Sequence, residues 1–284
     1  MSLEEIREAI EEQTGLRPEG APETIPGGCI NDSFRLGDFF VKTNSTEKSA
    51  MFSAEKLGLQ TLHAADAVRV PQAICSGTTS SQAFLVLELL PLAGGTMKSQ
   101  EELGRQLACL HRTTAPQFGW DHDNFIGPTP QPNPKCDSWI EFVREHRLAQ
   151  VLKLAEGCGY HFPIVDRLLA GIDRFFEGDP TPSLLHGDLW GGNASALADG
   201  TPVIFDPAVY FGDREADLAM TRLFGGFSAS FYAAYCEAWP LSPGHQQRCE
   251  LYNLYHILNH AVLFGGGYAR QAQGIIASLV SQLE

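Results

Sequence analysis

The chain has 284 residues, 44% of them hydrophobic and 19% charged, which is typical of a globular protein large enough for two lobes. Its formal net charge of -14 argues against nucleic acid or an anionic membrane as a partner, because both bind basic surfaces. Seven irregularly spaced cysteines form no Cys-x-x-Cys pair, so no structural zinc site is expected. No apolar run approaches membrane-span length and the acidic start does not resemble a signal peptide, so we expect a cytoplasmic protein.

The first 90 residues predict a small lobe rich in strands. Apolar residues at helical spacing predict a helix over the first dozen residues and a second helix over 47–63. A hairpin is predicted over 33–42, and two further strands over 73–78 and 84–90. We interpret residues 1–90 as a nucleotide-binding lobe that ends in a hinge.

Beyond residue 90 the apolar pattern becomes helical. Helices are predicted over 101–112, 138–156, 164–176, 215–223 and 248–264. We therefore expect residues 91–284 to form a larger helical lobe that carries the catalytic loop and the substrate pocket. The fold class predicted from this order is α+β, with the bilobal architecture of protein kinases.

The most informative segment is 186–193, His-Gly-Asp-Leu-Trp-Gly-Gly-Asn. It matches the kinase catalytic-loop pattern H-x-D-L-x-x-x-N, with Gly187 where protein kinases carry arginine. A second acid, Asp206, follows at the end of an apolar run. Phosphoryl transfer from ATP needs a carboxylate to accept the proton of the acceptor hydroxyl, and oxygen ligands for Mg²⁺. We predict Asp188 as the catalytic base, and Asn193 and Asp206 as the metal ligands.

Lys42 ends the second strand of the predicted hairpin, where a kinase places the lysine that contacts the nucleotide phosphates. Such a lysine needs a carboxylate from the following helix. Glu55 is the best candidate and Glu47 a weaker one. An exposed lysine at a strand end is the alternative interpretation, and the catalytic loop favours the functional one.

Two further segments are expected to contact ATP. The loop before the hairpin lacks the G-x-G-x-x-G spacing, but its position places Gly28 and Asn31 over the phosphates. The apolar strand 84–90 would form the hinge, where the backbone of Glu88 and Leu90 would contact the adenine.

The acceptor is predicted to be a small molecule. A new helix begins at Arg214, soon after Asp206, and no Ala-Pro-Glu motif follows. Little room is left for a long activation segment or a peptide-binding groove. Asp213 is expected to cap this helix, and Asp217 to support the catalytic loop from below.

Several motifs outside the catalytic loop narrow the class further. They are Leu107-Ala108-Cys109-Leu110-His111, Asn124-Phe125-Ile126-Gly127, Gln131-Pro132-Asn133, Trp190 after Asp188-Leu189, and Leu258-Asn259-His260. With them the chain resembles the fructosamine kinase (ketosamine 3-kinase) family, a branch of the kinase-like fold beside the aminoglycoside phosphotransferases. The resemblance spans nearly the whole chain, without a departure at a catalytic position.

The resemblance implies ATP- and Mg²⁺-dependent phosphorylation of the 3-hydroxyl of a sugar attached through an amine, such as fructosyl-lysine or ribulosyl-lysine. The phosphorylated adduct then breaks down and frees the amine, which makes the reaction a deglycation. The resemblance implies the same base, metal ligands and lysine as those predicted above. It adds Trp190 and His260 as candidates to line the ketosamine pocket, although both residue types are also common in protein cores.

Three alternatives stay open at this point. The chain could be a kinase of another small alcohol, such as an aminoglycoside or choline. It could be a pseudokinase that binds ATP and serves as a scaffold, although the catalytic residues are retained together. It could also be a homodimer whose redox response depends on Cys29.

Overall fold

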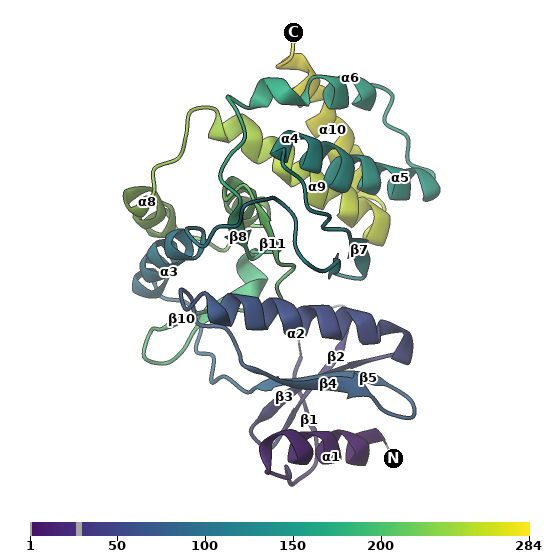
Figure 1. The fold of residues 1–284 in the computed structure, drawn as a ribbon, viewed down its shortest axis with the longest axis vertical. Coiled ribbons are helices and arrows are strands. Elements are labelled where there is room, and N and C mark those ends of the chain that lie inside the picture. The colour runs from purple at the N-terminus through teal and green to yellow at the C-terminus, as the bar shows by residue number, and fades with distance from the viewer. Residues whose placement is uncertain (1, 27–29) are drawn as a thin grey trace.

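The computed structural model describes residues 2–26 and 30–284, which form two lobes (Figure 1). A β-sheet with one helix on each face makes up the smaller lobe, and the larger lobe is mostly helical. The predicted α+β, bilobal kinase-like fold is confirmed. Within the described ranges, no helix is both long and apolar enough to cross a membrane.

The smaller lobe contains a five-stranded antiparallel sheet in the order β1-β2-β3-β5-β4. Its elements are α1 (Ser2–Thr14), β1 (Glu23–Thr24), β2 (Asp32–Leu36), β3 (Phe39–Asn44), α2 (Ser49–Ala64), β4 (Ala73–Thr78) and β5 (Ala83–Glu88). The elements predicted for this lobe are all present, with ends shifted by a few residues.

Both sets of alternating side chains on strand β5 are apolar, because the sheet is covered on both faces. Phe84 and Val86 pack with Ile6 and Ile10 of α1 on one face. Ala83, Leu85 and Leu87 pack toward α2 and the larger lobe on the other, as expected for side chains that alternate along a strand. Figure 1 shows α2 between the sheet and the larger lobe, with α1 beneath the sheet. A residue on α2 can therefore reach both lobes.

The larger lobe combines helices with short two-stranded sheets. Its helices are α3 (Met97–Leu110), α4 (Trp139–Val143), α5 (Gln150–Gly157), α6 (Val165–Ala170), α7 (Glu215–Leu223), α8 (Ala229–Ala238), α9 (His245–Phe264) and α10 (Gly267–Ser281). Its strands are β6 (Asn124–Ile126), β7 (Thr129–Gln131), β8 (Ser183–Leu185), β9 (Ala194–Ala196), β10 (Pro202–Ile204) and β11 (Tyr210–Gly212).

The predicted helices of this lobe differ from the observed ones in two ways. The helix predicted over 138–156 contains a π-helical turn at Arg144–Ala149, and that over 164–176 ends at Ala170, before a 3₁₀ turn at Ile172–Phe175. Helices α8 and α10 were missed. Three consecutive glycines, 265–267, indicate a turn in the sequence, but the third of them is the first residue of α10.

Strand pairing brings the two loops of the site together. Segment 186–193 lies between β8 and β9, and Asp206 lies between β10 and β11. Strand β8 pairs with β11, and β9 pairs with β10. Because the strands on both sides of each loop are hydrogen-bonded, the loops are held side by side. The backbone N–H of Ala208 also donates to the carbonyl of His186 at 2.8 Å.

Candidate active site

Lys42 lies at the centre of the site. It is 5% exposed on β3, and its Nζ lies 2.6 Å from Glu55 Oε1 on α2 and 2.6 Å from Asp206 Oδ1. Burial opposes the charge of this lysine, but the two carboxylates outweigh it and raise the pKa of Lys42 above its ordinary value. Lys42 is therefore a permanent cation that links the two lobes. The pair with Glu55 has the geometry expected for a lysine that contacts nucleotide phosphates.

Asp188 is partly buried at the start of the catalytic loop. Asn193, in the 3₁₀ turn Gly191–Asn193, donates from Nδ2 to the Asp188 carbonyl at 2.9 Å and to Asp188 Oδ2 at 3.4 Å. Burial and the nearby charges of Asp206 and Asp217 raise the pKa of Asp188 to about 7, against which the Asn193 contact is a small opposing effect. A carboxylate so poorly satisfied is a good acceptor for the proton of a bound hydroxyl.

Asp206 and Asn193 offer oxygen atoms suited to a magnesium ion. The side chain of Asp206 is 44% exposed, and only its Oδ1 is engaged by Lys42. Asn193 uses its amide nitrogen toward Asp188, which leaves the amide oxygen for a ligand. Mg²⁺ is commonly held by one or two such oxygens together with substrate phosphates and water, so these residues fit the ion. Asp206 adopts φ of +58°, a strained backbone that is common at functional positions.

Gly187 explains why this loop lacks the arginine of protein kinases. Its φ is +80°, and a Cβ atom there would lie 2.0 Å from the carbonyl oxygen of Ala208. Any side chain would force the catalytic loop away from the segment after Asp206. Glycine is required here for the close approach of the two loops.

The predicted phosphate-contacting loop is described only in part. Gly28 and Cys29 lie outside the described residues. Asn31 accepts a hydrogen bond at Oδ1 from Nδ2 of Asn44 at 2.9 Å, and the same Nδ2 donates to the carbonyl of Ile30 at 2.8 Å. Asn31 is thus tied to the end of β3, close in sequence to Lys42.

The predicted hinge residues lie at the end of β5. The backbone N–H of Glu88 donates to the carbonyl of Gln72 at 2.9 Å, and its carboxylate pairs with Arg69 at 2.5 Å. Leu90 lies beyond the strand, and its carbonyl accepts from the N–H of Leu92 at 2.9 Å. The N–H of Glu88 is therefore engaged within the smaller lobe.

Trp190 and His260 belong to one aromatic wall, but they do not stack on each other. Phe224, at the end of α7, lies between them, with its ring centroid 6.1 Å from Trp190 and 4.9 Å from His260. Trp190 is 40% exposed, and its ring lies over Gly192, where a Cβ atom would come within 2.2 Å of the indole. Phe224 was not singled out from the sequence, because only the fold places it beside the catalytic loop.

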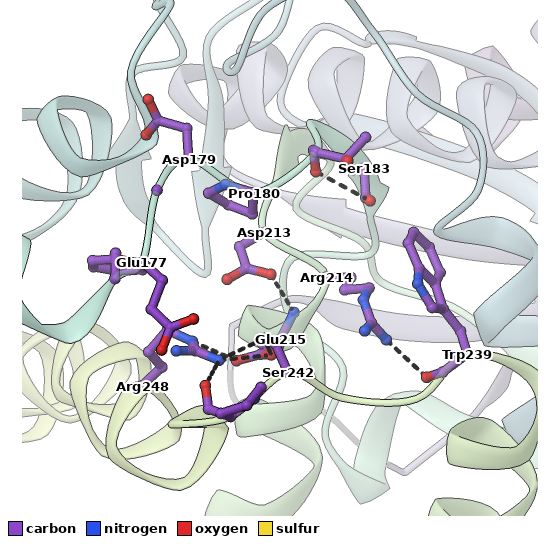
Figure 2. Close-up of a pocket in the computed structure, with 14 residues that line it drawn as sticks. Glu177, Asp179, Pro180, Ser183, Asp213, Arg214, Glu215, Trp239, Ser242 and Arg248 are labelled. Carbon is purple, nitrogen blue, oxygen red and sulfur yellow. Dashed lines mark hydrogen bonds and ion pairs between the residues drawn. The ribbon is translucent and has the colours of Figure 1, made fainter.

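A separate cavity of about 300 Å³ lies in the larger lobe, lined by residues before β8, at the start of α7 and before α9 (Figure 2). Asp213 lies in its wall and accepts hydrogen bonds from the N–H of Glu215 at 3.0 Å and from the hydroxyl of Tyr252 at 2.5 Å. None of the predicted site residues that the structure describes lines this cavity. It is distinct from the region in front of Asp188.

A strand-rich lobe with a buried lysine–glutamate pair, facing a helical lobe with a His-x-Asp loop, defines a kinase of the protein-kinase-like fold. The family model described as fructosamine kinase matches residues 2–282. The chain belongs to the fructosamine kinase family, and the resemblance inferred from its motifs is confirmed.

Individual proteins agree with this assignment. The chain is 49% identical over 259 residues to a probable ketoamine kinase of Synechocystis sp., covering 89% of this chain and 88% of that protein. It is 39% identical over 295 residues to the chloroplastic protein-ribulosamine 3-kinase of Arabidopsis thaliana, covering 100% and 90%. The crystal structure of a fructosamine-3-kinase candidate from Haemophilus somnus superposes with a TM-score of 0.92 at 30% identity, covering 98% of this chain and 97% of that one.

Proposed function

We propose that this kinase transfers the γ-phosphoryl group of ATP to the 3-hydroxyl of a ketosamine, a fructosamine or ribulosamine, and so acts in deglycation. The observation that carries the proposal is the open carboxylate of Asp188, which lies beside the metal-ligand candidate Asn193. The names of the ketoamine and ribulosamine kinases to which the chain is similar support this class of acceptor.

In the proposed reaction, Asp188 accepts the proton of the 3-hydroxyl while the oxygen of that hydroxyl forms a bond to the γ-phosphorus. The bond from that phosphorus to the oxygen bridging to the β-phosphate breaks, and ADP leaves. Most of the rate enhancement then comes from alignment and charge neutralisation, while the base contributes about 10²–10⁴-fold.

Residues of the smaller lobe would hold the nucleotide. Lys42, oriented by Glu55, would contact the phosphates, and Gly28 and Asn31 would cover them. The hinge backbone at Glu88 and Leu90 would contact the adenine.

Asn193 and Asp206 would hold Mg²⁺, which neutralises charge on the transferred group when it is bound. We assign residues 1–90 to nucleotide binding and 91–284 to the acceptor. We also propose that the protein works in the cytoplasm and can form a homodimer.

The acceptor would lie against the aromatic wall of Trp190, Phe224 and His260. The Nδ1 atom of His260 is 2.8 Å from the carbonyl of His256, which fixes the orientation of the ring. An aromatic wall with one polar edge suits a sugar carried on an amine, because the apolar face of the sugar stacks while its hydroxyls form hydrogen bonds.

The test is Mg²⁺-dependent ADP release with ribulosyl-lysine and fructosyl-lysine, beside a panel of aminoglycosides and choline. We expect turnover on a ketosamine that is lost in Asp188→Asn. Turnover only on another alcohol would refute the ketosamine acceptor and keep the kinase reaction. ATP binding without turnover on any acceptor would indicate a pseudokinase.

A further inference from the structure

The loop 224–228, between α7 and α8, carries one ring of the aromatic wall. Phe224, its first residue, is 39% exposed and lies between the other two rings of that wall. Gly225 and Gly226 follow, with φ of +74° and +99°. Because glycine adopts many backbone angles without strain, these two residues restrain the loop little. The position of the Phe224 ring therefore depends on the contacts that hold the loop.

On one side, the loop 224–228 packs backbone to backbone on the catalytic loop. A Cβ atom at Gly226 would lie 2.7 Å from the Cα atom of Gly191, and a Cβ atom at Gly191 would lie 2.8 Å from the carbonyl oxygen of Gly225. Both positions therefore need glycine for this contact. Gly191 begins the 3₁₀ turn that ends at Asn193, the candidate metal ligand. The loop thus connects the aromatic wall with the turn that carries a proposed metal ligand.

Gln100, near the start of α3, forms hydrogen bonds with two backbone groups of this loop. Its Nε2 donates to the carbonyl of Gly226 at 2.8 Å, and its Oε1 accepts the N–H of Ser228 at 2.5 Å. An amide side chain carries a donor and an acceptor together, so one residue can hold both groups. Among the described residues, no other side chain forms a hydrogen bond with the backbone of 224–228.

The start of α3 gives Gln100 a fixed position. Thr96 and Ser99 form a capping box, in which the Thr96 hydroxyl accepts the N–H of Ser99 at 3.1 Å and the Ser99 hydroxyl accepts the N–H of Thr96 at 2.7 Å. One turn after Gln100, a Cβ atom at Gly104 would lie 2.3 Å from the carbonyl oxygen of Phe231, so α3 and α8 are in close contact, side by side in Figure 1. Residues four apart share a helix face, which places Gln100 where α8 begins.

We propose that Gln100 is a positioning residue for acceptor binding: its two hydrogen bonds hold the loop 224–228 against the catalytic loop and so keep the ring of Phe224 in the aromatic wall. This inference rests on the proposed function, which assigns that wall to the acceptor. Gln100 acts through the loop, and neither of its hydrogen bonds involves Lys42 or Glu55, the residues proposed to hold the nucleotide phosphates. Its loss should therefore affect the acceptor and spare ATP.

The test compares Gln100→Met with the matched control Gln106→Met. Methionine nearly keeps the length and shape of glutamine but forms neither hydrogen bond. In Gln100→Met we expect KM for a ketosamine to rise about 5–10-fold, with kcat and KM for ATP at wild-type values, because the wall binds the acceptor equally in the ground state and the transition state. Gln106 lies on the same helix and donates to Glu102 Oε1 at 3.0 Å, within α3, so its substitution should leave all three constants unchanged.

A double-mutant cycle tests whether Gln100 acts through Phe224. In Phe224→Ala we expect KM for the ketosamine to rise at least as much as in Gln100→Met, because the ring itself is removed. Adding Gln100→Met to Phe224→Ala should then raise KM by less than about twofold, because no ring is left to position. Two effects that multiply in full would show that Gln100 acts independently of Phe224, and would overturn the proposal.

A second readout does not need turnover. The backbone N–H of Ser228 donates to Gln100 Oε1, so its hydrogen exchange should accelerate about 10-fold or more in Gln100→Met and stay at the wild-type rate in Gln106→Met. Unchanged exchange in Gln100→Met would show that the loop is held without this side chain, and would overturn the positioning role.

The outcomes separate this inference from the proposed function. A wild-type protein without ketosamine turnover refutes the proposed acceptor, while the exchange of the Ser228 amide still decides whether Gln100 holds the loop. With ketosamine turnover present, an unchanged KM in Gln100→Met would overturn the role of Gln100 alone. An equal rise of KM in Gln106→Met would also overturn it, because it would reflect general loosening of α3.

Discussion

The aspartate on the catalytic loop and the aspartate behind that loop have opposite surroundings. Among the described residues, the Asp188 carboxylate accepts one side-chain hydrogen bond, from Asn193 at 3.4 Å. Asp217 lies behind the loop and accepts three hydrogen bonds. Burial acts on both, yet the pKa of Asp188 is raised to about 7. For Asp217, donors led by His111 outweigh burial and lower the pKa below its usual value.

The difference in hydrogen bonding separates a residue suited to catalysis, Asp188, from one suited to supporting the loop, Asp217. An aspartate whose oxygens have few donors can accept a proton from substrate, but it stabilises the fold little. An aspartate whose oxygens are saturated by N–H groups has no capacity left for a substrate, and it fixes the backbone that carries the base. The two residues should therefore respond differently to the same substitution.

The largest expected effect is on turnover, in Asp188→Asn. We expect kcat to fall about 10²–10⁴-fold, because the amide cannot accept the hydroxyl proton. The free energy of unfolding should be equal to wild type or higher, since the repulsion from Asp206 and Asp217 is removed. Paired kinetics and urea unfolding measure both quantities. A variant that keeps its rate but loses stability would reverse the roles assigned to the two aspartates.

The next effect is on stability, in Asp217→Asn. The new amide group faces two backbone N–H donors with one acceptor oxygen fewer, so the free energy of unfolding should fall by about 2–4 kcal/mol. Asp199→Asn is the control, an exposed aspartate that accepts the N–H of Thr201 at 2.9 Å. Urea unfolding of both variants decides the point. An Asp217→Asn protein as stable as the control would contradict the supporting role.

The kinase residues could be predicted from the sequence because their spacing along the chain is a local pattern. The loop 186–193 and Asp206 follow a fixed spacing, and alternation in the first 90 residues gave the sheet. The network behind the loop was only partly predicted, since His111 and Tyr235 are 124 positions apart and meet only through the packing of α3 on α8. Phe224 was missed for the same reason. The ligand roles of the site residues stay predictions.

Two buried histidines, His111 and His256, differ in the same way, and the expected effect on stability is smaller. His111 has hydrogen bonds at both ring nitrogens, whereas no hydrogen bond to the ring of buried His256 is found among the described residues. Burial, with a smaller contribution from His260, lowers the pKa of His256 from 6.5 to about 3.

The sign of the effect on stability follows from proton uptake. Below about pH 6.5 the unfolded chain binds a proton at His256 and the folded protein does not, so this group costs stability as the pH falls from 6.5 toward 3. Between pH 7 and pH 5 the loss is about 2 kcal/mol for one such group. In His256→Gln we expect the stability difference between these pH values to shrink by that amount. The surface control His161→Gln should keep the wild-type difference, because the interior is unchanged. An unaltered difference in His256→Gln would mean that the ring takes up its proton in the folded protein much as it does in the unfolded chain.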